Sequence, residues 1–404
     1  MSAPPRRVLA VLSAAELCAM APWFSASAVA PALAREWHLD AFGTAGLTVS
    51  VQLGFVVGAL LSAILTLSDI WSARRLVAAA SLGAAVATVG VALSPGPAWG
   101  LGFRFLTGAA LAGVYPPGMK IAAGWFREAR GWAIGILVGA LTLGSAVPHL
   151  VRWAVPADMW RGVVLVAAAS ALLGGLLILL VPHDGPFAAP SPPFSWSAAP
   201  RILRDRAVLL ANLGYLGHMW ELYAMWTWIS AFVAASETAR LQGSGAPATT
   251  AALVTFGVVG IGAVGCWLGG KYADRLGRTA VTSAAMIVSG ICCLAVGPLF
   301  AKPLMLLVPL LLIWGVTVVA DSAQFSTAVS ELAPADYVGT ALTMQTSMGF
   351  LLTTITILLL PVVASAMGWR WAMSVLAVGP AFGVWAMMRL RRRPEAIRLA
   401  SGRR

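Results

Sequence analysis

The chain alternates between long apolar runs and short polar segments, and this alternation predicts its structure. Most runs hold about 20 residues or more, the length that a helix needs to cross a bilayer. We predict twelve membrane-spanning helices, at about residues 8–34, 43–67, 76–93, 99–122, a Gly-rich run that opens at 131, 162–181, 207–233, 248–270, 280–301, 303–332, 339–362 and 371–389. The fold class is therefore an all-α polytopic membrane protein. Pro22 is expected to kink the first helix near its middle.

The distribution of charge fits a membrane protein and predicts its orientation. Hydrophobic residues make up 59% of the chain and charged residues 10%, whereas soluble domains carry about 25% charged residues. Most of the 27 Lys and Arg residues fall in one set of loops, so the net charge of +12 indicates membrane topology and not nucleic-acid binding. Because positive loops remain in the cytoplasm, both termini are predicted to be cytoplasmic, in a bacterial-type inner membrane.

Several classes of function have no matching pattern in the sequence. The four cysteines, Cys18, Cys266, Cys292 and Cys293, lie within apolar runs and have neither a disulfide nor a metal-ligand spacing. No P-loop pattern and no nucleophile elbow occur. We therefore expect no cofactor, no metal, no enzymatic activity and no direct use of ATP. The N-terminal run is too long for a signal peptide and carries Glu16, so it is interpreted as an uncleaved first helix.

One charged turn between two apolar runs has an order that topology alone does not explain. Residues 270–278 read GKYADRLGR. The bias toward positive cytoplasmic loops accounts for Lys271, Arg275 and Arg278. It does not account for Asp274 in the middle of the turn or for the spacing of the glycines.

A degenerate copy of the same turn occurs half a chain earlier. Residues 67–75 read LSDIWSARR, and Asp69 precedes Asp274 by 205 residues. The pair Trp-Arg also occurs twice, at 160–161 and 369–370, with an offset of 209 residues. A repeat at about half the chain length indicates two similar halves of six helices each.

The order Gly-x-x-x-Asp-Arg-x-Gly-Arg closely resembles the signature loop of the major facilitator superfamily, which follows the second and eighth helices. The resemblance implies two pseudo-symmetric six-helix bundles, here residues 1–182 and 207–404, joined by a flexible Pro-rich cytoplasmic linker at 183–206. It also implies a monomer in the lipid bilayer that moves a small-molecule substrate by alternating access. In the family, the Asp of this loop lies near a helix end and pairs with an Arg across the bundles, which latches one state. The resemblance assigns the conformational latch to Gly270, Asp274, Arg275, Gly277 and Arg278, with Asp69, Arg74 and Arg75 in a weaker first copy.

Ionisable residues at membrane depth are costly, so each is a functional hypothesis. Three acids qualify, Glu16, Glu221 and Asp321, and His218 lies one helical turn before Glu221. A buried carboxylate can take up a proton from one side and release it to the other. We predict that these four residues couple protons to transport. The structural alternative for each is a hydrogen bond to a neighbouring helix, or a place in a polar core for His218.

Polar and aromatic residues share the same spans as these acids. The resemblance implies that the first, seventh and tenth helices line a central cavity, and all three carry a polar stripe. The predicted cavity residues are Gln52, Arg104, Trp220, Tyr223, Trp226, Trp228, Trp314 and Gln324. A structural or coupling role is the alternative for Arg104.

Together these features predict a proton-coupled secondary transporter. Acids outnumber bases at membrane depth and tryptophans flank Glu221, which favours export of a cationic or aromatic compound. Two alternatives stay open. One is uptake of a small organic anion at Arg104, and the other is a non-transporting membrane sensor with the same fold.

Overall fold

The structure, a computed structural model, describes residues 5–126, 130–188, 194–244 and 247–404. Helices make up most of this part of the chain, and no β-strand occurs in it. The helices of the first half are α1 (Pro5–Met20), α2 (Ser25–Ala28), α3 (Ala30–Glu36), α4 (Ala41–Ile64), α5 (Leu67–Ile70), α6 (Ala73–Leu93), α7 (Pro97–Leu111), α8 (Tyr115–Trp125), α9 (Arg130–Ala154) and α10 (Trp160–Ile178).

The second half begins with a short surface helix and then repeats the same plan. Its helices are η1 (Trp196–Ala198), α11 (Ala199–Arg204), α12 (Arg206–Arg240), α13 (Pro247–Gly260), α14 (Gly262–Leu276), α15 (Arg278–Ala295), α16 (Leu304–Ala320), α17 (Ser322–Leu332), η2 (Ala335–Tyr337), α18 (Val338–Met367), α19 (Trp369–Ala372), η3 (Met373–Ala377), α20 (Val378–Arg391) and η4 (Pro394–Gly402).

Within the described residues, these helices form the twelve membrane-spanning segments that the sequence predicts. Nine segments are long and apolar enough to cross a membrane when only length and composition are judged. The other three are α1–α3 and α7–α8, each broken into shorter helices, and α12, a 35-residue helix with His218 and Glu221 in its middle.

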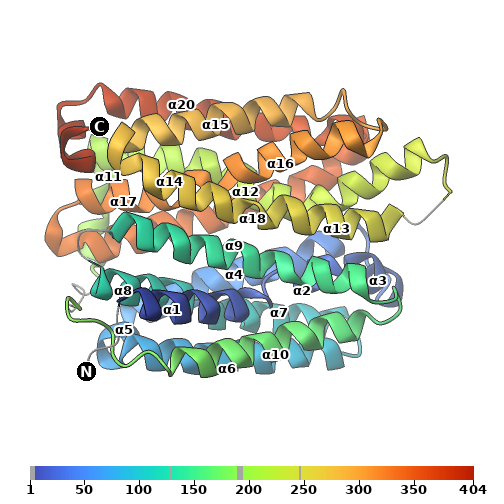
Figure 1. The fold of residues 1–404 in the computed structure, drawn as a ribbon, viewed down its shortest axis with the longest axis horizontal. Coiled ribbons are helices and arrows are strands. Elements are labelled where there is room, and N and C mark those ends of the chain that lie inside the picture. The colour runs from blue at the N-terminus through green and yellow to red at the C-terminus, as the bar shows by residue number, and fades with distance from the viewer. Residues whose placement is uncertain (1–4, 127–129, 189–193, 245–246) are drawn as a thin grey trace.

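The segments pack as two six-helix bundles (Figure 1). Helices α1–α10 form the N-terminal bundle and α12–α20 form the C-terminal bundle. Across the interface, α9 packs against α13 and α14, and α4 packs against α18. Both termini lie at the same end of the helices (Figure 1), which we call the basic end because most Lys and Arg residues fall in its loops.

Several membrane segments are interrupted where polar groups gather. The first breaks after Met20, next to Pro22, so the predicted kink is confirmed as a break. Proline explains it, because its ring lacks an N–H and clashes with the preceding turn. The tenth segment breaks at Asp321, between α16 and α17, which the hydropathy pattern did not reveal. Interrupted helices leave backbone groups free to bind other residues or ligands.

The linker is docked at its start. The Asp184 carboxylate accepts the backbone N–H groups of Ala73 (2.7 Å) and Arg74 (3.1 Å), and thereby caps α6. Trp125 donates its indole N–H to the His183 carbonyl at 2.9 Å. Contrary to the expectation of a flexible connection, this part of the linker is bound to the N-terminal bundle. Residues 189–193 lie outside the described chain.

Candidate functional site

The break between α16 and α17 brings Asp321 next to His218 of α12. Nδ1 of His218 lies 2.9 Å from Oδ1 of Asp321, and both side chains are almost completely buried. Within the described residues, no well-directed hydrogen bond reaches either oxygen of Asp321, and Nε2 of His218 has no partner. The contact is therefore a close pair of titratable groups with few competing partners. Histidine and aspartate side chains can each bind or release a proton, so the pair is a candidate proton-binding site.

Glu221 lies one turn beyond His218 and is bound inside the C-terminal bundle. Its Oε1 accepts hydrogen bonds from the Ser289 hydroxyl, the Cys293 thiol at 3.2 Å and the Trp314 indole. Several donors on one oxygen stabilise a buried carboxylate. Glu221 therefore faces α15 and α16. Trp314, predicted to line a cavity, binds Glu221 instead.

Two other tryptophans predicted to line a cavity are bound within the C-terminal bundle. The Trp220 indole donates to the carbonyl of Val375 at 3.3 Å, and the Trp228 indole donates to the carbonyl of Ile357 at 2.9 Å. These bonds hold both rings against neighbouring helices. Their contacts support a packing role and not the predicted cavity position.

Glu16 lies in the other bundle, apart from the His218–Asp321 pair. Its side chain is buried, and its Oε1 has no partner among the described residues. A Cβ atom added at Gly118 of α8 would lie 2.8 Å from its Oε2, so the carboxylate packs directly against that helix. Glu16 thus remains a separate candidate for proton binding.

Arg104 of α7 binds the broken first segment. Its Nε donates to the Leu47 carbonyl at 2.9 Å, and its Nη1 donates to the Pro22 carbonyl at 2.7 Å. Its Nη2 donates to the Trp23 carbonyl. The guanidinium is completely buried and joins the Pro22 and Trp23 carbonyls at the helix break to the Leu47 carbonyl of α4. This commitment to backbone favours the structural role and does not support a predicted cavity position.

An aromatic cluster fills the centre of the interface between the bundles. Its members are Trp23, Phe24 and Phe55 from the N-terminal bundle and Tyr223, Trp226 and Phe350 from the C-terminal bundle. Ring centroids lie 4.5 Å apart for Phe55 and Phe350 and 5.7 Å apart for Trp23 and Tyr223. Rings at these distances attract each other beyond their apolar burial. The cluster holds the two bundles together at mid-height, and two predicted cavity residues belong to it.

The same region contains buried polar groups without partners. The indole N–H groups of Trp23 and Trp226 have none within the described residues, and neither has the side-chain amide of Gln52. Gln52 lies one turn before Phe55 of the cluster on the same face of α4. Each unpaired buried group costs about 1–3 kcal/mol, so such groups call for an explanation. One explanation is a bound ligand that supplies the missing hydrogen bonds.

The loop at 270–278 contacts the other bundle through Asp274. A Cβ atom added at Gly131 would lie 2.9 Å from Oδ2 of Asp274, so the carboxylate lies against the first turn of α9. The N-terminus of a helix carries partial positive charge and favours an anion. Oδ1 of Asp274 lies 3.3 Å from Nη2 of Arg278. Across the bundles, Asp274 therefore contacts the N-terminus of α9 and not an arginine among the described residues. The arginine that it pairs with, Arg278, belongs to its own loop.

Arg278 binds the loop to the end of α17. Its Nε and Nη2 donate to the two carboxylate oxygens of Glu331 at 2.8 and 2.6 Å, and its Nη1 donates to Oε1 of Gln324 at 2.8 Å. A bidentate pair of this kind is among the stronger polar contacts in proteins. Gln324, predicted to line the cavity, therefore belongs to this network.

The glycines of the loop are explained by close backbone approach. A Cβ atom at Gly270 would lie 3.0 Å from the carbonyl oxygen of Gly131. Gly277 has φ +93°, and a Cβ atom there would lie 2.0 Å from the carbonyl oxygen of Arg404. A larger residue at Gly277 would therefore strain the turn and displace the C-terminal segment.

The first copy of the loop makes different contacts. Arg74 donates its Nη1 to the carbonyl of Val181 at 2.8 Å, within its own bundle, and Arg75 is exposed. Arg275 of the second copy is exposed as well. The side chain of Asp69 lies outside the described residues, so its latch role stays a prediction.

Sequence reasoning missed several partners of these groups. Ser289 and Cys293 stand one turn apart in an apolar run, which is a weak signal of a shared polar face. Glu331 ends a span and was not singled out. Phe55 and Phe350 look like ordinary core residues in the sequence, so no local signal marks them.

A comparison with known families gives one match that spans most of the chain. A family model described as the Major Facilitator Superfamily matches residues 12–355. Among curated protein sequences, none matches the chain significantly.

Solved structures of membrane transporters share the fold. A bacterial homolog of the human lysosomal transporter Spinster, in an inward-facing and occupied conformation, aligns with a TM-score of 0.74 at 16% identity, over 97% of this chain and 98% of that chain. The proton:xylose symporter XylE aligns with a TM-score of 0.71 at 14% identity, over 95% and 94%. The human organic anion transporter MFSD10 aligns with a TM-score of 0.68 at 17% identity, over 96% and 100%. Similarity at this level of identity shows the fold and not the substrate.

Proposed function

Because this chain belongs to the major facilitator superfamily, we propose that it is a secondary active transporter that moves a small molecule across the inner membrane by alternating access and is coupled to protons. Both termini face the cytoplasm in this proposal, because most Lys and Arg residues lie at the end that carries the termini. The protein acts as a monomer and carries out no enzymatic reaction.

The observation that carries the proton coupling is the buried pair of His218 and Asp321. The two groups lie 2.9 Å apart where the tenth membrane segment is broken. Charge at this depth is costly, so a proton that neutralises the pair changes the free energy of the state in which it is buried. Glu221, one turn away, is the second proton-binding candidate of the same bundle. A difference in pH across the membrane would bias the equilibrium between the two transport states through these groups.

The aromatic cluster between the bundles supports a substrate with an aromatic ring. A ring of the substrate would replace some of the ring contacts that the two bundles make with each other in this structure. The unpaired N–H groups of Trp23 and Trp226 would donate to acceptors on the substrate, and the amide of Gln52 would donate or accept. We therefore propose export of a small aromatic compound, neutral or cationic, that carries hydrogen-bond acceptors.

The contacts of Arg104 weigh against uptake of an organic anion. Three of its nitrogen atoms donate to backbone carbonyls, so its charge is already engaged. A non-transporting sensor would keep the fold but would show no flux. Transport is favoured because Asp321 of the pair lies where one membrane segment is interrupted, a typical feature of ion and substrate sites in transporters.

The proposal is tested with purified protein in proteoliposomes. A thermal-shift panel of aromatic cations, neutral aromatic compounds and organic anions identifies binders, and flux of the best binder is then measured with and without an inside-acid or inside-alkaline pH gradient. We expect an aromatic binder and flux that follows the gradient. Binding without flux under any gradient would identify a sensor, and binding of anions alone would support the alternative.

The ligand site is tested separately with Trp226→Phe, which keeps a ring and removes the N–H. We expect substrate affinity to fall about fivefold, the size of one hydrogen bond. Trp385→Phe is the matched control, because Trp385 is exposed on α20 and stacks on Phe382. Equal affinity in both variants would remove Trp226 from the site.

A further inference from the structure

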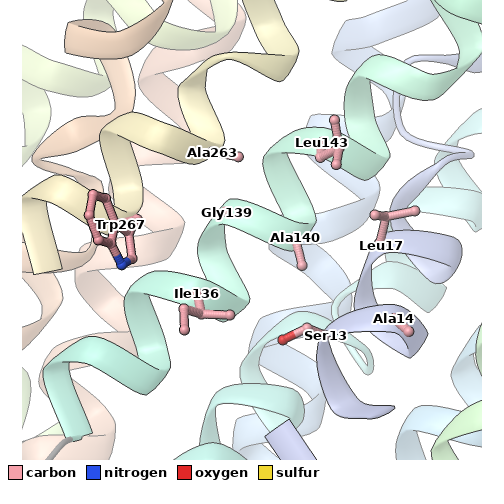
Figure 2. A pocket seen from close by; sticks show the side chains of 9 residues that line it. All are labelled: Ser13, Ala14, Leu17, Ile136, Gly139, Ala140, Leu143, Ala263 and Trp267. Atoms are coloured by element: carbon pink, nitrogen blue, oxygen red, sulfur yellow. The ribbon is translucent and has the colours of Figure 1, made fainter. Parts of the chain in front are cut away.

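A groove between the two bundles opens on the outer surface of the molecule (Figure 2). Its volume is about 320 Å³, within the range of small-molecule binding sites. Helix α1 contributes Ala14 and Leu17, α9 contributes Ala140 and Leu143, and α14 contributes Trp267. The polar side-chain groups of the lining are the Ser13 hydroxyl and the Trp267 indole N–H, and small apolar side chains form much of the rest.

The depth of the groove identifies the surrounding medium. Helix α9 starts at the basic end, and its lining residues run from Ile136 to Leu143. At 1.5 Å per residue, they lie about 9–20 Å along the helix from that end. The hydrocarbon core of a bilayer is about 30 Å thick, so this stretch lies mainly in the leaflet at the basic end. Acyl chains are therefore the molecules that meet the groove.

Two polar features give the groove a direction. Lys271 lies one turn beyond Trp267 toward the basic end, and its Nζ is 4.9 Å from the centroid of the Trp267 ring. Its ammonium group is thus held at the end of the groove that faces the lipid headgroups. Within the groove, the Ser13 hydroxyl oxygen is buried and has no partner among the described residues. The nearby Asp274 carboxylate is engaged by Arg278 and by the start of α9.

We propose that the groove binds one acyl chain of an anionic phospholipid from the leaflet at the basic end, with the lipid phosphate at Lys271. The chain packs against the small residues of α1 and α9, and the Ser13 hydroxyl donates to an ester carbonyl of the lipid. Because the groove is lined by helices of both bundles, the lipid stabilises the arrangement of the bundles in which the groove exists. Anionic lipid is thus a regulatory ligand, distinct from the transported substrate.

The headgroup preference is tested by native mass spectrometry of the purified full chain. Phosphatidylglycerol and phosphatidylcholine with identical acyl chains are compared. We expect wild type to bind phosphatidylglycerol about fivefold more tightly, the effect of one cation near the membrane surface. Lys271→Gln should remove the preference and leave the affinity for phosphatidylcholine unchanged. Lys302→Gln, which removes an exposed lysine at the opposite end of the molecule, should keep the preference.

The groove itself is tested by filling it. Two variants, Ala140→Leu and Ala14→Leu, should each reduce binding of both lipids several-fold. Ala14 is exposed, so a larger side chain there does not disturb the core. Undiminished binding in both variants would overturn the groove as the site. Equal binding of the two lipids by wild type, or a preference that survives Lys271→Gln, would overturn the role of the cation. Neither readout involves transport, so failure here leaves the proposed transport function untouched.

Discussion

His218 and Asp321 lie 2.9 Å apart, although they come from α12 and from the junction of α16 and α17, 103 positions later in the chain. Both are buried in a part of the C-terminal bundle where apolar side chains predominate. A pair of titratable groups in such a place changes its net charge when it gains or loses one proton. In the proposed transport function, that change in charge is what would couple protons to transport.

Asp321→Asn should abolish substrate accumulation driven by a pH gradient and leave substrate exchange largely intact. Asparagine keeps the volume and the polarity of the side chain, but it cannot change charge, so the carrier reorients without using the gradient. Gradient-driven uptake and counterflow are measured side by side in proteoliposomes. Asp158→Asn is the control, because Asp158 is exposed in the loop between α9 and α10. Wild-type accumulation in Asp321→Asn would move the coupling role to Glu221, and wild-type accumulation in Glu221→Gln as well would move it to Glu16.

Arg104→Lys should destabilise the protein and leave substrate affinity unchanged within about twofold. A lysine ammonium cannot reach the carbonyls of Leu47, Pro22 and Trp23 together, so at least one hydrogen bond from a buried charged donor is lost. The expected cost is about 3 kcal/mol, from hydrogen bonds to a charged donor. Thermal unfolding and ligand titration of the folded fraction test this. Loss of affinity for anions without loss of stability would instead indicate a substrate role for Arg104.

Asp274→Asn should reduce transport about tenfold while expression and unfolding temperature stay near wild type. The carboxylate is half exposed at the end of α14 and lies against the N-terminus of α9, so its charge stabilises one arrangement of the bundles rather than the core of either. A charge at a helix N-terminus is worth about 1 kcal/mol, and somewhat more when it is partly buried. Asp69→Asn should have a smaller effect, because the first copy of the loop is degenerate. Initial rates of flux compare the two variants, and full activity in Asp274→Asn would contradict the latch role.

The contact of Glu36 with Trp160 and Arg161 should make stability depend on acid pH. Partial burial by itself raises the pKa of the Glu36 carboxyl, but hydrogen bonds from Trp160 and Arg161 outweigh it and hold the pKa below its ordinary value of 4.5. A lowered folded-state pKa stabilises the protein above the unfolded pKa, and this stabilisation is lost as the pH falls through the folded value.

We therefore expect the unfolding temperature of wild type to fall between about pH 5 and pH 3, and we expect this fall to be smaller in Glu36→Gln. The difference should be about 2 °C at most, because the Glu36 side chain is more than a third exposed and solvent screens the ion pair. Asp158→Asn should keep the wild-type dependence. Identical curves for wild type and Glu36→Gln would show that the contact contributes nothing to stability.

The sequence by itself determined the number of membrane segments and the repeat of two halves. It also marked the loop at 270–278 and the acids at membrane depth. These properties can be found from neighbouring residues alone. A bilayer requires about 20 apolar residues in each span, and a charged residue within such a span is rare. The kink at Pro22 belongs to the same class, since a proline ring in a helix interior removes a hydrogen bond and disfavours the regular helix, although Pro148, Pro309 and Pro361 lie inside unbroken helices.

Only the tertiary structure decided which partner each buried polar group meets. Glu221 and His218 share a face of one helix, yet Glu221 is bound by α15 and α16 while His218 meets Asp321. Arg104 looked like a cavity residue and instead holds a broken helix. Nothing in the local sequence marks Phe55 and Phe350 as neighbours across the bundles. The physical reason is that helical periodicity fixes the direction of a side chain only within its own helix, whereas its partners depend on how the helices are packed and where they break.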